Sequence, residues 1–171
     1  MKRIILSAVV MLTCLLTAQA QRFALVDMEF ILQQIPAYQQ AGQQLEKLGQ
    51  QWQREVEARS AEAKTLYEAY QQSAASLTAA QRSAKEDAIV AKEREAAELR
   101  KRYFGPEGEL AKKREELMEP IQNAVYEAVK QLAVQRGYDA VIDRASAQSM
   151  IFASPKIDIS NEVLAKMGYS N

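Results

Sequence analysis

The chain has 171 residues and 22 basic and 22 acidic side chains, so its formal charge at pH 7 is zero. This balance gives no strong positive field of the kind that nucleic acid binding requires. It has no histidine and one cysteine, which removes the common zinc ligands and the Ser-His triad arrangement.

The first 20 residues have the pattern of a cleavable secretory signal. A basic pair, Lys2-Arg3, precedes an apolar run from Ile4 to Leu16, and Ala18-Gln19-Ala20 fits a cleavage site. The run of about 13 residues is too short for a membrane anchor, which needs about 20. Cys14 lies inside the run rather than after it, which argues against a lipoprotein signal. We therefore expect cleavage after Ala20.

Cleavage removes two basic residues and the only cysteine, which leaves 20 basic and 22 acidic side chains, a charge of −2, and no disulfide. The mature chain has no other apolar stretch long enough to cross a bilayer. No phosphate-binding or dinucleotide-binding glycine motif is present. Acidic pairs such as Glu86-Asp87 and Glu115-Glu116 are adjacent, so they do not converge on a helix. We expect no enzyme, no metal and no cofactor.

Residues 22–27 are apolar on both faces and predict a short buried strand. Asp27 can cap a short helix that continues to Ile35. Pro36 ends that helix and suits the first position of the next one.

Residues 37–104 contain only five β-branched side chains and predict long helices. Apolar positions recur every three or four residues, as in a coiled coil. On the first leg they are Leu45, Leu48, Trp52, Val56, Ala63, Leu66, Tyr70, Ala74 and Leu77. A leg of about 38 residues extends about 57 Å, longer than a small domain is wide. We therefore expect a projecting arm, with a compact helical bundle as the alternative.

The turn between the two legs is predicted near residues 75–78. Thr78 and Gln81 have the spacing of a capping box, and small residues at 73–76 precede it. A short turn favours an antiparallel pair. Residues 69–81 carry no charge. They form either a weakly restrained soluble tip or an unspecific contact surface.

The second leg has its apolar stripe at Ile89, Ala96, Leu99 and Tyr103 and a charged outer face. A helix break is predicted at 105–108, Gly-Pro-Glu-Gly. Helical periodicity then resumes to Arg136, and Gly137 suits a left-handed C-cap. The predicted arm covers 37–116.

The remaining segments, 21–36 and 117–171, predict a small body. Strands are expected at 138–143 and 148–153, followed by a last short helix capped by Asp158 or Ser160 and ended by Gly168. Three short strands leave exposed edges, and so small a body needs an additional stabilising element. We therefore predict an α+β fold, mostly α, with a helical hairpin on a body that oligomerises.

The order of these features resembles the Skp (OmpH-like) family of periplasmic chaperones. The likeness is carried by residues 23–28 with 32–34, by 121–125 through 137–143, and by 158–160 with 163–164. It implies a periplasmic homotrimer whose three arms enclose a cavity. It also implies holding of unfolded outer-membrane proteins without ATP, and their transfer to the outer-membrane assembly machinery.

The resemblance further implies client binding on the inner arm faces and strand-mediated trimerisation. The arm candidates are Tyr67, Tyr70, Leu77 and Tyr103. The body candidates are Phe23, Leu25, Val26, Val141, Ile142, Ile151 and Phe152. The alternative for each arm aromatic, and our expectation for Trp52, is packing between the legs.

Two features depart from the basic, positively tipped members of that family: the slightly acidic mature chain and the uncharged tip. An envelope spacer or adaptor that docks one specific partner is the alternative function. A cytosolic prefoldin-like chaperone would use the same kind of helical hairpin, but the signal sequence argues against it.

Overall fold

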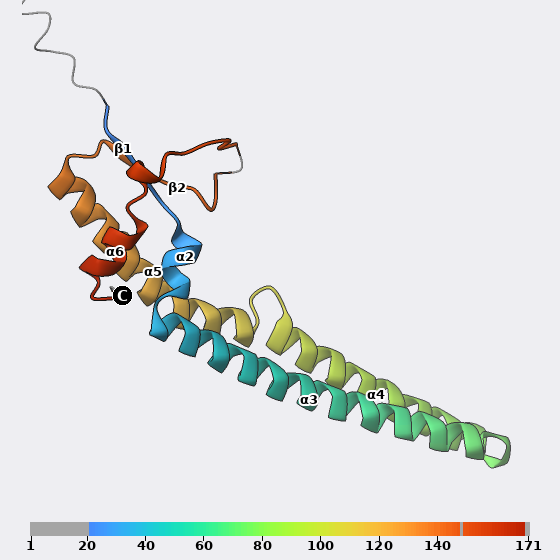
Figure 1. Cartoon of the computed structure of the whole chain (residues 1–171). Coiled ribbons are helices and arrows are strands. Elements are labelled where there is room, and N and C mark those ends of the chain that lie inside the picture. Colours follow the sequence, from blue (N-terminus) through green and yellow to red (C-terminus); the bar gives the residue numbers. More distant parts are fainter. Residues whose placement is uncertain (1–20, 148, 170–171) are drawn as a thin grey trace, which may run out of the picture. The chain divides into compact units, whose positions relative to one another are not determined.

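The computed structural model describes residues 21–147 and 149–169, and the predicted signal at 1–20 lies outside them. The chain divides into two compact units. The hairpin unit is Ile35–Asn123, and the body unit comprises the chain before and after it. The architecture is mostly helical with one small sheet (Figure 1). The predicted α+β fold with a long helical hairpin is confirmed.

The first leg of the hairpin is helix α3 (Pro36–Ser73), 38 residues long. Its proline occupies the start of the helix, where a missing N–H has no intrahelical partner to lose. The helix runs without interruption through Gly42 and Gly49. At 1.5 Å per residue it is about 57 Å long.

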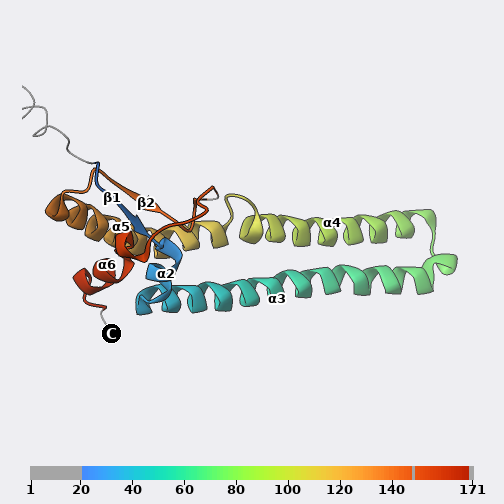
Figure 2. The same ribbon diagram turned by 45° about the horizontal axis from the view of Figure 1, so that its top comes forward.

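The turn is formed by the 3₁₀ segment η1 (Ala74–Ser76) and extended Leu77, before helix α4 (Ala79–Phe104). The backbone N–H of Thr78 donates to Gln81 Oε1 (2.9 Å), and the N–H of Gln81 donates to Thr78 Oγ1 (3.3 Å). The predicted capping box is therefore present. Figure 2 shows α3 and α4 running antiparallel on either side of this turn.

The two legs bury a narrow seam of apolar side chains, as the stripe pattern predicts. Its buried members on the two legs are Ala41, Leu45, Val56, Ala63, Ile89, Ala96 and Tyr103. Val56 is fully buried, whereas Leu66 of the predicted stripe is 39% exposed. The seam holds the legs together, but three of its buried members are alanines, which fill little space.

The predicted break separates α4 from helix α5 (Glu109–Arg136). The N–H of Gly105 donates to Lys101 O, and the N–H of Gly108 donates to Gly105 O, both at 2.9 Å. A Cβ atom at Gly105 would lie 2.4 Å from the Lys101 carbonyl oxygen, so the turn requires glycine there. Arg102 Nε bridges the break to Glu109 Oε1 (2.6 Å).

The sheet of the body unit pairs strand β1 (Phe23–Val26) in parallel with strand β2 (Ala140–Asp143). Phe23 lies opposite Ala140, and Val26 lies opposite Asp143. The other side of β1 bridges to Asp158, and the N–H of Ile159 donates to Leu25 O (2.9 Å).

The predicted strand at 148–153 is wrong for residues 149–153, which form no strand; Gln148 lies outside the described residues. The position beside β1 that a third strand would take is held by Asp158, just after the 3₁₀ segment η2 (Pro155–Ile157). Ile151 and Phe152 therefore lie outside the two described strands.

Two short helices complete the body unit. In α2 (Met28–Gln33) the Asp27 carboxylate accepts from the Phe30 N–H (2.8 Å), as predicted. Helix α6 (Ser160–Lys166) packs against α2 and has Ile159 at its N-cap, rather than Asp158 or Ser160. Gly137 has the predicted left-handed conformation (φ 67°), and Gly168, which was predicted only to end the last helix, is also left-handed (φ 84°). The buried apolar residues of this unit are Ala24, Leu25, Val26, Ile31, Leu32, Val125, Ala128, Leu132, Ile159, Val163 and Leu164.

Candidate functional site

An aromatic cluster joins the two legs near the helix break. The rings of Trp52 and Tyr103 stack with centroids 4.9 Å apart and an interplanar angle of 8°. Phe104 meets Tyr103 edge-on at 6.4 Å, and the Arg102 guanidinium lies 5.7 Å from the Tyr103 ring centroid. The Tyr103 hydroxyl donates to Glu55 on the other leg, and this bond together with burial raises the pKa of Tyr103 above 10.0.

Tyr103 is only 8% exposed, so its ring belongs to the core of the hairpin. Tyr103 therefore packs between the legs, which was the alternative given for the arm aromatics. Trp52 stacks on its ring. A residue in this position stabilises the hairpin and has little surface to offer another chain.

The three remaining arm candidates lie closer to the turn. Tyr67 is 48% exposed, and its hydroxyl accepts from Gln71 Nε2 (2.9 Å). Tyr70 is half-buried and its hydroxyl donates to Glu86 on the other leg, which raises the pKa of Tyr70 above 10.0. Leu77 is half-buried in the turn itself. Of the four, Tyr67 presents the most exposed ring.

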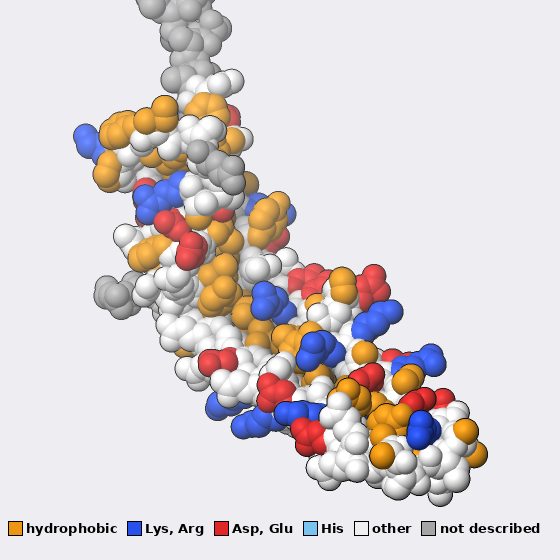
Figure 3. Space-filling model, turned by 90° about the vertical axis from the view of Figure 1, so that its right-hand side faces the viewer, with side chains coloured by type: hydrophobic (Ala, Val, Ile, Leu, Met, Phe, Trp, Pro, Cys, Tyr) orange, Lys and Arg blue, Asp and Glu red, His pale blue; other side chains and the backbone are white. Residues whose placement is uncertain are grey.

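The charge-free stretch at 69–81 consists largely of exposed small and amide side chains. In Figure 3 hydrophobic side chains run in a band along the hairpin, with charged side chains beside the band. This face of the hairpin therefore offers apolar contacts along its length.

The seven body candidates fall into two groups. Leu25 and Val26 are each 3% exposed and pack within their own chain. The other group comprises half-buried Val141 and the exposed residues Phe23, Ile142, Ile151 and Phe152. Ile151 is fully exposed and Phe152 is 84% exposed. Ile151 and Phe152 are neighbours in the sequence, and contiguous exposed apolar side chains are a feature of surfaces that another protein covers.

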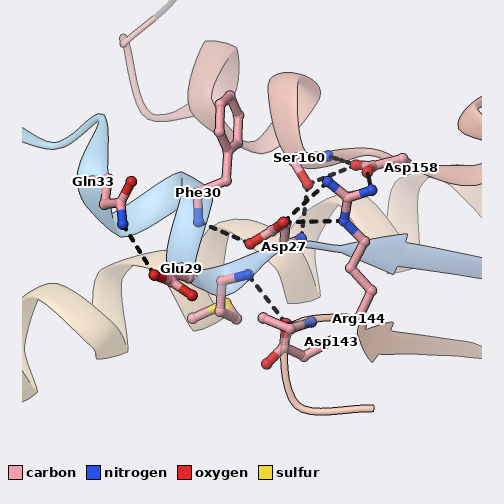
Figure 4. Close-up of polar contacts among 10 residues, drawn as sticks. Asp27, Glu29, Phe30, Gln33, Asp143, Arg144, Asp158 and Ser160 are labelled. Atoms are coloured by element: carbon pink, nitrogen blue, oxygen red, sulfur yellow. Dashed lines mark hydrogen bonds and ion pairs between the residues drawn. The ribbon is translucent and has the colours of Figure 1, made fainter. Parts of the chain in front are cut away.

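A polar cluster that was not predicted from the sequence joins three distant segments of the body (Figure 4). Arg144 donates to Asp27 Oδ2 from Nε (3.1 Å) and Nη2 (3.0 Å), and its Nη1 lies 3.3 Å from Asp158 Oδ2. Ser160 Oγ accepts from the Asp27 N–H (2.8 Å) and donates to Asp158 Oδ1 (2.6 Å). The only local signal was that Asp27 and Asp158 suit helix caps.

In the described ranges, 21–147 and 149–169, no three side chains of His, Cys, Asp or Glu are grouped so that they could hold a metal ion. The acidic groups of the polar cluster, Asp27 and Asp158, face Arg144. None of the described helices is both long enough and apolar enough to cross a membrane.

Comparisons with known proteins agree on one family. The family model described as outer membrane protein (OmpH-like) matches residues 22–167. The chain is 27% identical over 151 residues to chaperone protein Skp of Yersinia enterocolitica, covering 88% of each chain.

The fold is also similar to the crystal structure of an OmpH-like protein from Caulobacter crescentus CB15. The TM-score is 0.67 at 11% identity, covering 85% of this chain and 82% of that chain. At this identity the likeness concerns the fold alone. Since the family model spans both the hairpin and the body, the chain belongs to the OmpH-like outer membrane protein family.

Proposed function

We propose that the protein is a periplasmic chaperone that holds unfolded outer-membrane proteins and keeps them soluble for membrane assembly. The observation that carries this proposal is the match of the OmpH-like family model to residues 22–167. The similarity to a chaperone named Skp, which extends over 88% of both chains, supports the same role.

The hairpin suits a holding mechanism without ATP and without catalysis. Its tip carries no charge over residues 69–81, and Tyr67 presents an exposed ring. Weak contacts of this kind can adapt to many unfolded chains. The sequence has no glycine-rich phosphate loop with its lysine. We assign Tyr67, Tyr70 and Leu77 to the client-binding surface and Tyr103 to the hairpin core.

The active form in this proposal is a homotrimer with three hairpin arms around a cavity. The exposed apolar residues of the body, Phe23, Ile142, Ile151 and Phe152, supply surface for self-association. Transfer of the client to the outer-membrane assembly machinery completes the proposed role.

Light scattering on the chain that begins at Gln21 tests the proposal, alone and after dilution of a urea-unfolded outer-membrane β-barrel protein into it. We expect a trimer and a soluble complex with the barrel protein in the absence of nucleotide. A monomer, or a trimer that lets the barrel protein precipitate, would contradict the proposal and favour an envelope spacer or adaptor.

A further inference from the structure

One face of the hairpin contains a groove of about 740 Å³ between α3 and α4. Ala63 and Ala96, both buried, line it together with exposed Ala97. Three alanines fill less space than the Val and Ile side chains found elsewhere along the seam. The groove therefore results from small residues at positions where the two legs meet.

The groove has the length of a short extended peptide. On α4 it reaches from Glu93 to Phe104, a rise of about 17 Å at 1.5 Å per residue. An extended chain advances about 3.3 Å per residue, so this length accommodates about five or six residues. Tyr67 and Phe104 line its two ends, and the two residues are 48% and 36% exposed.

The groove carries positive charge that the chain itself does not neutralise. Arg100 and Lys101 line it, and neither forms an ion pair with any described residue. Lys64 reaches Glu68 only at 3.8 Å, and Glu93 is the single acidic lining residue. The lining therefore has a formal charge of +2 (three cations and one carboxylate).

Two cations of α4 near the groove are paired instead. Lys92 lies 2.7 Å from Glu95 and 3.7 Å from Glu62, and Arg94 lies 2.9 Å from Glu98. The lining of the groove thus has a net positive charge on a chain whose mature form is slightly acidic. A lining with net positive charge attracts a ligand with negative charge.

We propose that this groove binds an extended segment of five or six residues of an unfolded polypeptide that carries both acidic and aromatic side chains. The inference rests on the proposed chaperone function and assigns that function a specific contact. Carboxylates of the segment pair with Arg100 and Lys101, and its rings contact Tyr67 and Phe104. Cations lie between two aromatic ends, an order that suits a peptide with alternating side chains better than a lipid with one charged end.

The test measures fluorescence anisotropy of a labelled ten-residue Gly-Ser peptide that carries two Phe and two Glu residues at alternate positions. We expect Arg100→Gln/Lys101→Gln to weaken binding about fivefold, since each exposed ion pair contributes little by itself. The matched control is Lys47→Gln/Arg54→Gln, which removes two cations of α3 that lie outside the groove. It should bind as the unchanged protein does.

A steric pair of variants tests the groove independently of charge. Ala97→Leu places a larger side chain in the groove at an exposed position, and Ala91→Leu makes the same change at an exposed position of α4 outside it. We expect only Ala97→Leu to weaken peptide binding.

Three results would overturn the inference: equal binding by Ala97→Leu and the unchanged protein, equal binding of a peptide with Lys in place of Glu, or binding of phosphatidylglycerol vesicles through Arg100 and Lys101 without peptide binding. The barrel-solubility assay separates the two proposals. If the barrel protein stays soluble but the peptide does not bind, only the proposal of peptide binding in the groove is contradicted. Peptide binding in the groove while the barrel protein precipitates contradicts the holding function alone.

Discussion

At the scale of single residues, Tyr103 shows how one side chain fastens both legs. Its ring stacks on Trp52 of α3, and its hydroxyl donates to Glu55 of the same helix. A hydrogen bond to a charged acceptor is stronger than one between neutral groups. Both interactions act between α3 and α4, so the contribution of Tyr103 is to the stability of the hairpin.

The raised pKa of Tyr103 predicts how this contribution depends on pH. The folded chain holds the phenolic proton more tightly than the unfolded chain, whose tyrosines titrate near 10. The stabilisation is therefore complete below about pH 10 and is lost as pH rises through the folded-state pKa. Urea unfolding at pH 8 and at higher pH should show a smaller decrease in stability for Tyr103→Phe than for the unchanged protein. Identical decreases would contradict this assignment.

At the scale of elements, the turn at Gly105 changes the path of the returning leg between α4 and α5. Its N–H makes the last helical bond, to Lys101 O, and its ψ of 167° then takes the chain out of the helix. Backbone atoms crowd the position where a side chain would begin. This crowding makes Gly105 necessary for packing reasons, although its φ of −63° is open to any residue.

We predict that Gly105→Ala destabilises the hairpin by about 1–3 kcal/mol, the usual range for forcing an extra carbon into a packed position. Gly49→Ala is the matched control, because no atom lies within 4 Å of its added carbon and the position is inside α3. That variant should stabilise by about 0.5–1 kcal/mol, since alanine loses less backbone entropy in a helix. Urea midpoints of the two variants should move in opposite directions. A shift of the same sign in both would contradict this reading of the turn.

The elements that the sequence predicts well are those set by neighbouring residues. Thr78 and Gln81 are three positions apart and form the capping box by themselves. A strand instead depends on a partner elsewhere in the chain, and hydrophobic residues at 149–153 cannot reveal that Asp158 takes the place beside β1. For the same reason the cluster of Arg144 with Asp27 was not predicted.

In the candidate site, too, the features that depend on distant residues could not be predicted from the sequence. Tyr67 and Tyr103 both occur in helical stretches of the hairpin, yet one is half-exposed and the other is buried. Which side chains enter the seam depends on how α3 and α4 align with each other. The groove beside Ala97 depends on the same alignment, so its small residues carried no signal in the sequence.

At the scale of the whole molecule, the exposed side chains of Ile151 and Phe152 predict self-association. We expect Ile151→Asp/Phe152→Asp to lower the mass measured by light scattering towards that of a monomer, because charge opposes burial in an apolar interface. Helical content by circular dichroism should stay unchanged, since both side chains are exposed in their own chain. Val90→Asp, at an exposed position of the hairpin, is the control. An undiminished oligomer mass in the double variant would exclude this surface.

The parallel pairing of β1 with β2 also has a consequence for the order of folding. Arg22 and Asp139, which flank the paired strands and bond to each other, are 117 positions apart. Closing a chain segment of that length costs about 4 kcal/mol of chain entropy, whereas α3 and α4 meet through a short turn. We therefore expect the hairpin to form early and the sheet late. Until Ala140 has joined Phe23, the first strand of the chain has no parallel partner, so its exposed edge depends on the last third of the polypeptide for protection.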